Sequence, residues 1–387
     1  TPPDDLSSVH RDGDTTMSLT LPQRFGTSSK RASATGRPAG QNGRDPARKG
    51  TAMGEMQAFI EGLPKAELHL HIEGTLEPEL KFLLAERNGI KLPASSVEEM
   101  KAAYDFDDLS SFLDVYYEGM SVLLAEEDFF DLTRAYFRRV HPQNLRYAEI
   151  FFDPQAHTSR GISFETVIQG IHRAQEQASL ELGIESQLIM CFLRDMTAES
   201  AASTLAESAR FKDWIIGVGL DSDEKGNPPV KFASVFAEAR SMGYRLTMHC
   251  DVDQENSVEH IWQCLNDIGV ERVDHGVNSL EDDLLVSALL ERGIPMTVCP
   301  ISNSYVTDGT KAAQIKRMLD LGLKVTVNSD DPAYFPGYVQ ENLIVVQEEA
   351  GLTREELVQL SRNAFDAAWL PEDRRATYLS ALADYSA

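Results

Sequence analysis

Short apolar runs recur along the chain from residue 53 onward, and stretches with helical periodicity separate most of them. Their length and their content of β-branched and aromatic residues are typical of buried strands. The eight runs span residues 66–74, 146–154, 186–195, 214–223, 244–251, 272–277, 295–303 and 324–332. Strand–helix alternation repeated eight times predicts parallel βα units, and eight such units close a barrel. The pattern therefore predicts an α/β protein with a TIM (β/α)8 barrel.

The intervals between these runs carry amphipathic patterns that predict helices, for example over residues 163–183 and 257–269. Asn256 and Ser257 are suitable capping residues for the second of these helices. The interval between the first and second strands is unusually long and contains three helical stretches, at residues 78–90, 96–106 and 109–140. We therefore expect a helical insertion after strand 1 that serves as a cap or lid.

Residues 1–52 differ in composition from the rest of the chain. They are rich in Ser, Thr, Gly, Pro, Arg and Asp and poor in aliphatic residues. Such a segment cannot bury enough apolar surface to offset the entropy lost on ordering. We expect residues 1–52 to be a disordered N-terminal tail and residues 53–387 to form one metal-dependent catalytic domain.

The charge of the chain is strongly acidic. It has 36 Lys and Arg against 61 Asp and Glu, a formal net charge of −25. Residues 1–52 contain eight basic residues and five Asp, which leaves the remainder with a net charge of −28. An acidic body repels phosphate backbones, so we expect no nucleic-acid partner and favour a small neutral or cationic substrate.

Cysteine usage and hydropathy indicate the compartment. The four cysteines are not arranged in CxxC or other close pairs, so the sequence suggests neither a disulfide framework nor a thiolate zinc site. The longest apolar runs have the length of strands, and the N-terminus carries no apolar secretory segment. We expect a cytoplasmic protein without a membrane span, and the sequence does not fix its oligomeric state.

The stretch "ELHLHIEG" at residues 67–74 places two histidines one residue apart in a predicted strand. Side chains at i and i+2 lie on the same face of a strand. His69 and His71 therefore share one face, and the leucines and isoleucine between and beside them take the other. An isolated pair of this kind indicates a metal site only weakly.

Further polar residues close other predicted strands, at the end of a barrel where active sites are found. They are His249 after strand 5, His275 after strand 6, and Asp330 with Asp331 after strand 8. Each alone fits a core histidine, a turn or a helix cap. Together with the first pair they favour zinc held by three imidazoles and a carboxylate, with a position left open for water. Zinc would lower the pKa of that water towards about 7, and His275 would orient or deprotonate it.

Four motifs give the chain a resemblance to the adenosine/adenine deaminase branch of the amidohydrolase superfamily, from about Leu63 to near the C-terminus. They are "LPKAELHLHIEGTLEPEL", "VDHGV", "TVCPISN" and "VTVNSDDP". The resemblance implies a barrel with one zinc ion per subunit. Such an enzyme replaces the 6-amino group of a purine with oxygen and releases ammonia.

The resemblance also implies roles for individual residues. The implied metal ligands are His69, His71, His249 and Asp330. His275 would polarise or deprotonate the water, and Asp331 would hydrogen-bond purine N7. The segment 219–229, which contains Asp221 and Glu224 as candidate substrate-binding residues, would approach the N3 edge. Two-metal relatives carry a carboxylated lysine at the end of strand 4, where this chain has Asp221 and Ser222, which favours a single metal.

Two features resemble the subgroup that acts on free adenine. Adenosine-specific relatives usually carry Asp two residues after the second histidine, whereas this chain has Glu73 in "HIEGTLEPEL". The stretch "EIFFDPQAH" in strand 2 also resembles the adenine subgroup. A longer carboxylate could fill the ribose space. Alternatively, Glu73 merely caps a helix that begins near Pro78.

The loop after strand 5 departs from the family pattern. Relatives follow the strand-5 histidine with Ala-Gly-Glu, whose glutamate protonates purine N1, but position +3 here is Val252. Alignment on the following helix shows about two extra residues in this loop. The candidates for the acid are Asp251, Asp253 and Glu255, and Asp253 lies nearest the expected place.

The sequence therefore predicts a zinc-dependent hydrolytic deaminase that converts adenine to hypoxanthine and ammonia in purine salvage. One alternative is an adenosine or N6-modified purine deaminase, since the altered loop lies where the amino group leaves. The other is a catalytically impaired metal-binding homologue. The altered acid motif favours the latter, whereas retention of His275 and of both aspartates argues against it.

Overall fold

Eight parallel strands form the centre of the computed structural model, which describes residues 46–106 and 108–387. The strands are β1 Lys65–Glu67, β2 Leu145–Phe152, β3 Glu185–Leu193, β4 Ile215–Asp221, β5 Arg245–Cys250, β6 Arg272–His275, β7 Met296–Val298 and β8 Val325–Val327. They pair in chain order, and each overlaps one of the eight runs predicted from the sequence. The prediction of a (β/α)8 barrel is confirmed.

The barrel closes between β8 and β1 through isolated contacts, and no ladder joins these two strands in the described part of the chain. The Leu68 backbone N–H donates to Asn328 Oδ1 at 2.9 Å, and the Asp330 N–H donates to the His69 carbonyl at 3.1 Å. Parallel bridges join Leu70 to Asp330 and His71 to Phe151. The extended chain thus continues past the three-residue strand β1 to the predicted histidines.

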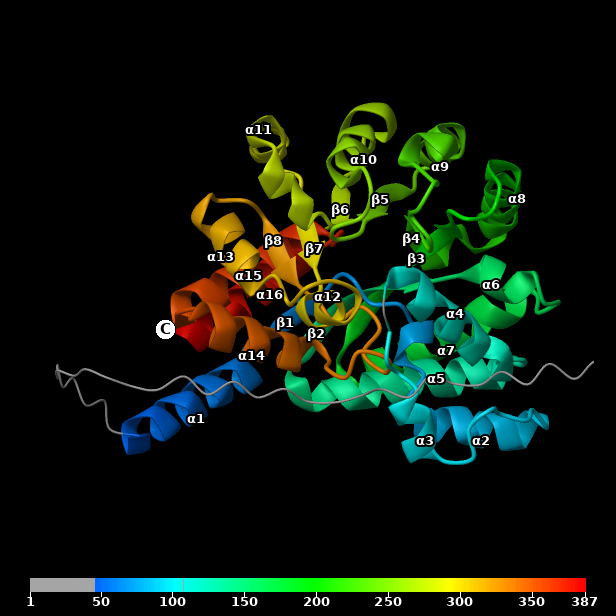
Figure 1. Ribbon diagram of the computed structural model, residues 1–387, viewed down its shortest axis with the longest axis horizontal. Coiled ribbons are helices and arrows are strands. Elements are labelled where there is room, and N and C mark those ends of the chain that lie inside the picture. Colours follow the sequence, from blue (N-terminus) through cyan, green and yellow to red (C-terminus); the bar gives the residue numbers. More distant parts are fainter. Residues whose placement is uncertain (1–45, 107) are drawn as a thin grey trace, which may run out of the picture. The chain divides into compact units, whose positions relative to one another are not determined.

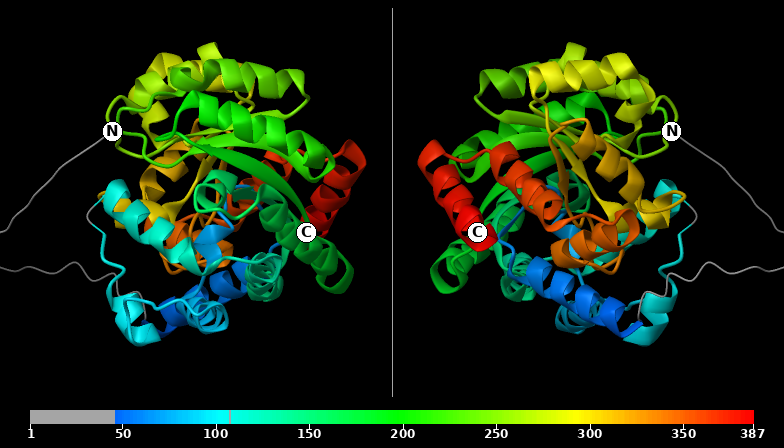
Figure 2. Two further views of the ribbon diagram at one scale, coloured as in Figure 1. Left: turned by 90° about the vertical axis from the view of Figure 1, so that its right-hand side faces the viewer. Right: turned by 90° about the vertical axis from the view of Figure 1, so that its left-hand side faces the viewer.

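Helices surround the strands. Figure 1 shows α8 to α11 outside β3 to β7, and the side views of Figure 2 show the C-terminal helices, in red, beside the strands. The helices between and after the later strands are α6 Pro154–Thr158, α7 Phe164–Leu182, α8 Ala198–Ser208, α9 Ala233–Ser241, α10 Ser257–Gln263, α11 Asp283–Arg292, α12 Pro300–Val306, α13 Ala312–Asp320, α14 Val339–Ala350, α15 Arg354–Ala367 and α16 Glu372–Ser386. Helix α15 packs against β1 and β8, and so covers the seam of the barrel.

The long interval between β1 and β2 is helical, as predicted. It holds α2 Pro78–Asn88, α3 Val97–Ala102, α4 Leu109–Gly119 and α5 Glu126–Val140. Helix α5 packs along α7 outside the barrel, so it takes the place of the ordinary first barrel helix. The preceding helices are the insertion, and α4 reaches the cavity described below.

The capping residues of two helices can be compared with the sequence pattern. Helix α7 begins after Ser163, whose hydroxyl accepts the Thr166 N–H, and ends at Gly183 in the left-handed conformation. Helix α10 begins after Asn256, as predicted. However, Asn256 has φ 66° and its side chain makes no capping hydrogen bond within the described residues. The backbone turn, not a side-chain cap, therefore sets the start of α10.

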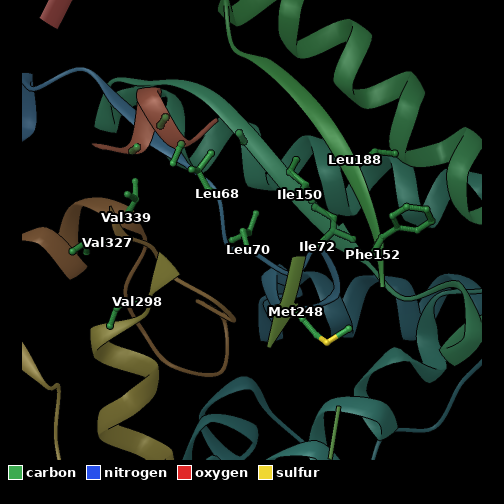
Figure 3. Close-up of a cluster of buried hydrophobic side chains, with 14 of the residues drawn as sticks. Leu68, Leu70, Ile72, Ile150, Phe152, Leu188, Met248, Val298, Val327 and Val339 are labelled. Atoms are coloured by element: carbon green, nitrogen blue, oxygen red, sulfur yellow. The ribbon is translucent and has the colours of Figure 1, made fainter. Parts of the chain in front are cut away.

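The hydrophobic core lies between the strands and the helices. Leu68, Leu70 and Ile72 are fully buried and belong to one cluster with Ile150 and Phe152 of β2. Figure 3 shows these side chains together. Because neighbouring side chains on an extended chain point to opposite faces, this packing turns the intervening histidines towards the barrel interior.

The first helix changes one boundary of the predicted tail. Residues 1–45 lie outside the described residues, but α1 Pro46–Gly62 begins within the segment assigned to the tail. The backbone of residues 46–52 is thus helical. Across the described residues, no helix combines the length and apolar character needed to cross a lipid bilayer.

Candidate active site

One cavity lies at the carboxyl ends of the strands, and most of the predicted site residues line it. These are His71, His249, His275, Asp330, Asp331 and Asp221. His69 lies directly behind them, fully buried, with its ring 4.6 Å from those of His249 and His275 between centroids. The structure thus brings together residues that are up to about 260 positions apart in the chain, as expected for this end of a barrel.

Nitrogen and oxygen donors converge on Asp330. Its Oδ1 lies 3.1 Å from His69 Nε2 and 3.5 Å from His71 Nε2. His71 Nε2 is in turn 3.1 Å from His249 Nε2. Potential ligand atoms of His69, His249, His275 and Asp330 all lie within 4.8 Å of one another.

The outer ring nitrogens of the three predicted ligand histidines face oxygen atoms. His69 Nδ1 is 2.9 Å from Thr297 Oγ1, and His71 Nδ1 is 3.4 Å from Asp221 Oδ2. His249 Nδ1 faces Asp274 Oδ2 at 3.8 Å. The Thr297 hydroxyl is within hydrogen-bond distance of the His69 ring, and the other two oxygens lie farther away. Oxygens on this side of the rings leave Nε2 directed at the centre, as is usual around metal-binding histidines.

The electrostatics of the cluster suit a cation. Burial lowers the pKa of His71, and burial together with the neighbouring imidazoles lowers that of His249 well below its ordinary value. These rings are therefore neutral and have lone pairs available. Burial opposes ionisation of Asp330, but the adjacent imidazoles lower its pKa well below the usual range. Neutral imidazoles beside a carboxylate form a donor set that fits zinc.

Two of these residues adopt a strained backbone. His275 has φ 57° and Asp330 has φ 66°, in the left-handed region that residues other than glycine rarely occupy. Such conformations cost of order 1–3 kcal/mol and are concentrated at functional sites. The surrounding structure therefore holds the backbone at these two strand ends in a conformation that is unfavourable for an isolated residue.

His275 stands beside the carboxylate of Asp251. The distance from His275 Nε2 to Asp251 Oδ1 is 3.0 Å, and Asp251 lines the cavity. Burial alone would lower the pKa of His275, but the bond to Asp251 and its negative charge raise it to about 9. A cation held by the neighbouring donors would lower this pKa again by repulsion. With such a cation bound, the proton that the pair shares would move to Asp251, so that His275 would be the proton acceptor and Asp251 the proton donor on this wall of the cavity.

Asp331 depends on a glycine for its position. A Cβ at Gly74 would lie 2.0 Å from Asp331 Oδ1 and 2.7 Å from Asp331 Cα, so no side chain fits there. Burial, and next the neighbouring carboxylate of Asp330, raises the pKa of Asp331 well above its ordinary value. A neutral Asp331 can donate a hydrogen bond to an acceptor nitrogen of a ligand.

Apolar and aromatic side chains cover the polar floor. Most come from helix α4 of the insertion, and the remainder from α12 and two loops at this end: Leu109, Phe112, Leu113, Tyr116, Tyr117, Val252, Val306 and Phe335. A small cavity with mostly apolar walls and a few polar groups is typical of sites for flat aromatic ligands. Within the described residues, no lysine or arginine lines it.

The predicted general acid, Asp253, does not belong to this cavity as the described residues form it. Its side chain is 44% exposed and pairs with Lys311 Nζ at 2.7 Å and with Asn278 Nδ2 at 3.0 Å. Asp253 has φ 58°, which turns the loop after β5 and carries its side chain outward. The other candidate, Glu255, is exposed, so only Asp251 of the three reaches the cavity.

Glu224, predicted to bind substrate, is fully buried behind the cavity wall. Its Oε2 accepts the Asp251 backbone N–H at 2.9 Å and lies 3.3 Å from Arg194 Nη1. Its Oε1 pairs with His260 Nδ1 of helix α10. In this structure Glu224 therefore supports the loop that carries Asp251 and does not face the cavity.

Glu73 also lies behind the wall. Its Oε1 accepts the Asp153 backbone N–H at 3.1 Å and bonds His157 Nε2 at 2.9 Å, and both side chains of that second pair are fully buried. It does not cap α2, because Glu77 occupies the N-cap position of that helix. The Glu73 side chain is thus long enough to reach the backbone directly after β2.

Several cavity residues received no role from the sequence, among them the polar residues Asp153, Ser222, Ser302 and Asn303. Asp153 and Ser222 directly follow β2 and β4, so their place after a predicted strand could have identified them. Asn303 belongs to the motif "TVCPISN" and lies in α12, where a helical residue gives no such signal.

Comparisons with known proteins agree with this geometry. The adenosine deaminase family model matches residues 64–385. An adenine deaminase of Hahella chejuensis is 49% identical over 332 residues, which cover 85% of this chain and 99% of that protein.

Two solved structures extend the comparison. The adenine deaminase from Arthrobacter aurescens is 42% identical with a TM-score of 0.81, covering 84% of this chain and 99% of that chain. A zinc-bound amidohydrolase from Burkholderia ambifaria is 27% identical with a TM-score of 0.76, covering 85% and 92%. With the barrel and its histidine–aspartate centre, these matches show that the chain belongs to the adenosine deaminase family of the amidohydrolase superfamily and is a purine deaminase.

Proposed function

We propose that this purine deaminase is a zinc-dependent adenine deaminase, which converts adenine and water to hypoxanthine and ammonia. The convergence of histidine nitrogens on Asp330, beside His275 and Asp251, carries the proposal. His69, His71, His249 and Asp330 would hold one zinc ion per subunit. When bound, zinc supplies a water acidic enough to ionise near neutral pH.

The protein's own groups would then move the protons of the reaction. His275 takes a proton from the attacking water, and the oxygen forms a bond to C6 of the purine. Asp251 gives a proton to N1, which makes C6 electrophilic and stabilises the negative charge that develops on the ring. The C6–N6 bond then breaks as His275 returns its proton to the departing amino group, which leaves as ammonia. The hydroxyl proton on C6 passes to Asp251, so that C6=O forms, Asp251 is restored to its acid form and N1 keeps its hydrogen in hypoxanthine.

Asp331 would hold the base from its other side. Asp331 also lines the cavity and would donate a hydrogen bond to N7, and the aromatic residues of α4 would cover the ring faces. Free adenine is the favoured substrate because the relatives at 49% and 42% identity are adenine deaminases.

The test is a substrate panel on purified protein. Adenine, adenosine and N6-methyladenine are each incubated with the enzyme, and ultraviolet absorbance and released ammonia or methylamine are measured. We expect adenine alone to be converted to hypoxanthine, in protein that elemental analysis shows to contain one zinc per chain. Faster turnover of adenosine or N6-methyladenine would support those alternatives, and no amine from any of the three would indicate an impaired homologue.

A further inference from the structure

A buried acid at the end of β2 has no role in the chemistry above. Asp153 is 1% exposed and lines the cavity, and its Oδ1 has no hydrogen-bond partner among the residues that the structure describes. Ser222, after β4, also lines the cavity. Its buried hydroxyl makes no hydrogen bond of good geometry within the described ranges, although the Tyr117 hydroxyl lies beside it. Unpaired buried polar atoms are costly, so groups of this kind in a cavity point to a ligand.

Asp153 is held in place from behind. Its backbone N–H is bound by Glu73, which His157 Nε2 also contacts. His157 Nδ1 in turn lies 2.8 Å from Arg160 Nη2, and Arg160 donates to the Leu123 carbonyl at 2.6 Å. Burial lowers the pKa of His157, and a neutral ring fits this chain because it donates at Nε2 and accepts at Nδ1. The hydrogen bonds of Glu73, His157 and Arg160 therefore fix the position of Asp153.

The strand order fixes which part of a purine this acid would meet. His275 and Asp330 follow β6 and β8, and β2 and β4 lie across the barrel from them. Atom C6 must lie on the His275 side. The N3/N9 edge lies on the opposite side of the purine ring from C6, so it faces Asp153 and Ser222.

That edge distinguishes the free base from the nucleoside. In adenine it presents the acceptor N3 beside the donor N9–H, whereas in adenosine N9 carries ribose and donates nothing. Asp153 supplies an acceptor and Ser222 a donor, which is the complementary pair. Burial, and then the carboxylates of Asp221 and Glu73, raises the pKa of Asp153 well above its ordinary value. A neutral carboxyl also matches such an edge, since it has one acceptor oxygen and one O–H.

We propose that Asp153 selects the free base by binding the N9–H of the purine, with the Ser222 hydroxyl donating to N3 and Glu73 holding Asp153 in position. This inference rests on the proposed adenine deaminase function and adds the determinant of its specificity. It assigns to Asp153 the selective contact that the sequence alone suggested for Glu73.

The test compares purines that differ only at N9. Binding of hypoxanthine and 9-methylhypoxanthine is measured by calorimetry, and turnover of adenine and 9-methyladenine by absorbance. The methyl group removes the N9–H with little added bulk. We expect the zinc-loaded wild type to prefer the N9–H compound by about 100-fold in both assays, since a site built to bind an N–H rejects an analogue that lacks it.

Three variants and one control variant assign that preference to residues. Asp153→Ala should reduce it to less than about tenfold, whereas Asp153→Asn, which keeps an acceptor and a donor, should retain most of it. Ser222→Ala should weaken binding of both compounds equally, because both contain N3. Asp195→Asn, at an exposed carboxylate after β3 outside the described lining of the cavity, should change nothing. Zinc content and thermal unfolding are measured for each variant.

The outcomes separate the two proposals. If the wild type releases no ammonia from adenine, the proposed function fails and the inference fails with it. If the wild type deaminates adenine but Asp153→Ala keeps the full preference, only the inference is overturned. The same conclusion follows if the wild type treats 9-methyladenine like adenine, or if Asp153→Asn loses the preference as completely as Asp153→Ala.

Discussion

Buried charged groups have different surroundings at the two ends of the barrel. At the amino end, Lys65 Nζ lies within 2.9 Å of three backbone carbonyl oxygens. Arg272 and Glu149, both fully buried, pair at 2.6 Å, and the Arg272 guanidinium also lies over the ring of Trp369. Lys65 thus faces carbonyl dipoles and Arg272 faces a carboxylate and an aromatic ring, although Nε and Nη2 of Arg272 are buried without hydrogen-bond partners in the described structure.

At the carboxyl end like charges are gathered. Asp330 and Asp331 are adjacent, and burial raises the pKa of nearby Asp221 to about 6. Asp331 Oδ1 and His275 Nδ1 are buried without hydrogen-bond partners in the described structure. Two strand ends there also have a strained backbone.

The difference shows which end is built for stability and which for binding. An unsatisfied buried polar group costs about 1–3 kcal/mol, so selection for stability alone would remove it. Asp331 Oδ1 lines the cavity, where a ligand can complete it, whereas the unpartnered nitrogens of Arg272 lie outside the described lining of that cavity. Substitutions at the amino end should therefore change folding, and substitutions at the carboxyl end should change activity.

The largest effect is expected at Asp251. Asp251→Asn removes the acid placed for N1 and should lower kcat about 1,000-fold, within the range for general acid–base groups, with zinc content unchanged. Asp253→Asn is the matched control and should retain wild-type kcat, because Asp253 pairs with Lys311 away from the cavity. Steady-state kinetics with adenine measure both. The reverse pattern would return the acid role to Asp253.

At the amino end, Lys65→Met should destabilise the protein by about 3 kcal/mol, because the carbonyls of Ile60, Leu63 and Gln143 lose their donor. Urea unfolding followed by circular dichroism measures this change. The kcat per folded molecule should stay unchanged, and Lys91→Met, at an exposed lysine, should alter neither quantity. A loss of kcat without loss of stability in Lys65→Met would contradict the division between the two ends.

Gly74→Ala tests whether Asp331, at the carboxyl end, must keep its exact position. The added methyl group would displace Asp331, including its backbone, and should lower kcat/KM about 100-fold, since a 1 Å misplacement costs about that much. Gly54→Ala in α1, where a Cβ meets nothing within 4 Å, serves as the control. Wild-type kcat/KM in Gly74→Ala would show that Asp331 needs no fixed position.

The smallest effect is expected from truncation. We propose that residues 53–387 carry catalysis. A chain lacking residues 1–45 should therefore keep kcat and the unfolding midpoint within about twofold and about 2 °C, because every described cavity residue and barrel strand follows residue 53. Kinetics and thermal unfolding of the shortened chain provide the measurement. A tenfold loss of activity would assign the segment a part in the site.

The barrel was predictable because its strands are apolar runs of strand length and its helices keep a helical period. The six residues that close predicted strands, among them His69 and Asp331, were predictable for the same reason. The carboxyl ends of all eight strands lie at the same end of the barrel. A residue that directly follows a predicted strand is therefore expected at the cavity.

The loop residues were not predictable in this way. The path after β5 is set by left-handed turns at Asp253 and Asn256, and alternation of apolar and polar residues does not report such turns. Glu224 and Glu73 are drawn away from the cavity by His260 and His157, partners 36 and 84 positions along the chain. Only the folded structure shows which carboxylate a buried histidine binds.

The seam between β8 and β1 joins residues from opposite ends of the catalytic region, and His69, His71 and Asp330 sit directly on it. During synthesis, the emerging polypeptide would carry His69 and His71 for most of its length before the aspartate that completes the centre is made. The full donor set thus arrives only with the last strand of the barrel, and a product that terminates before residue 330 would lack it.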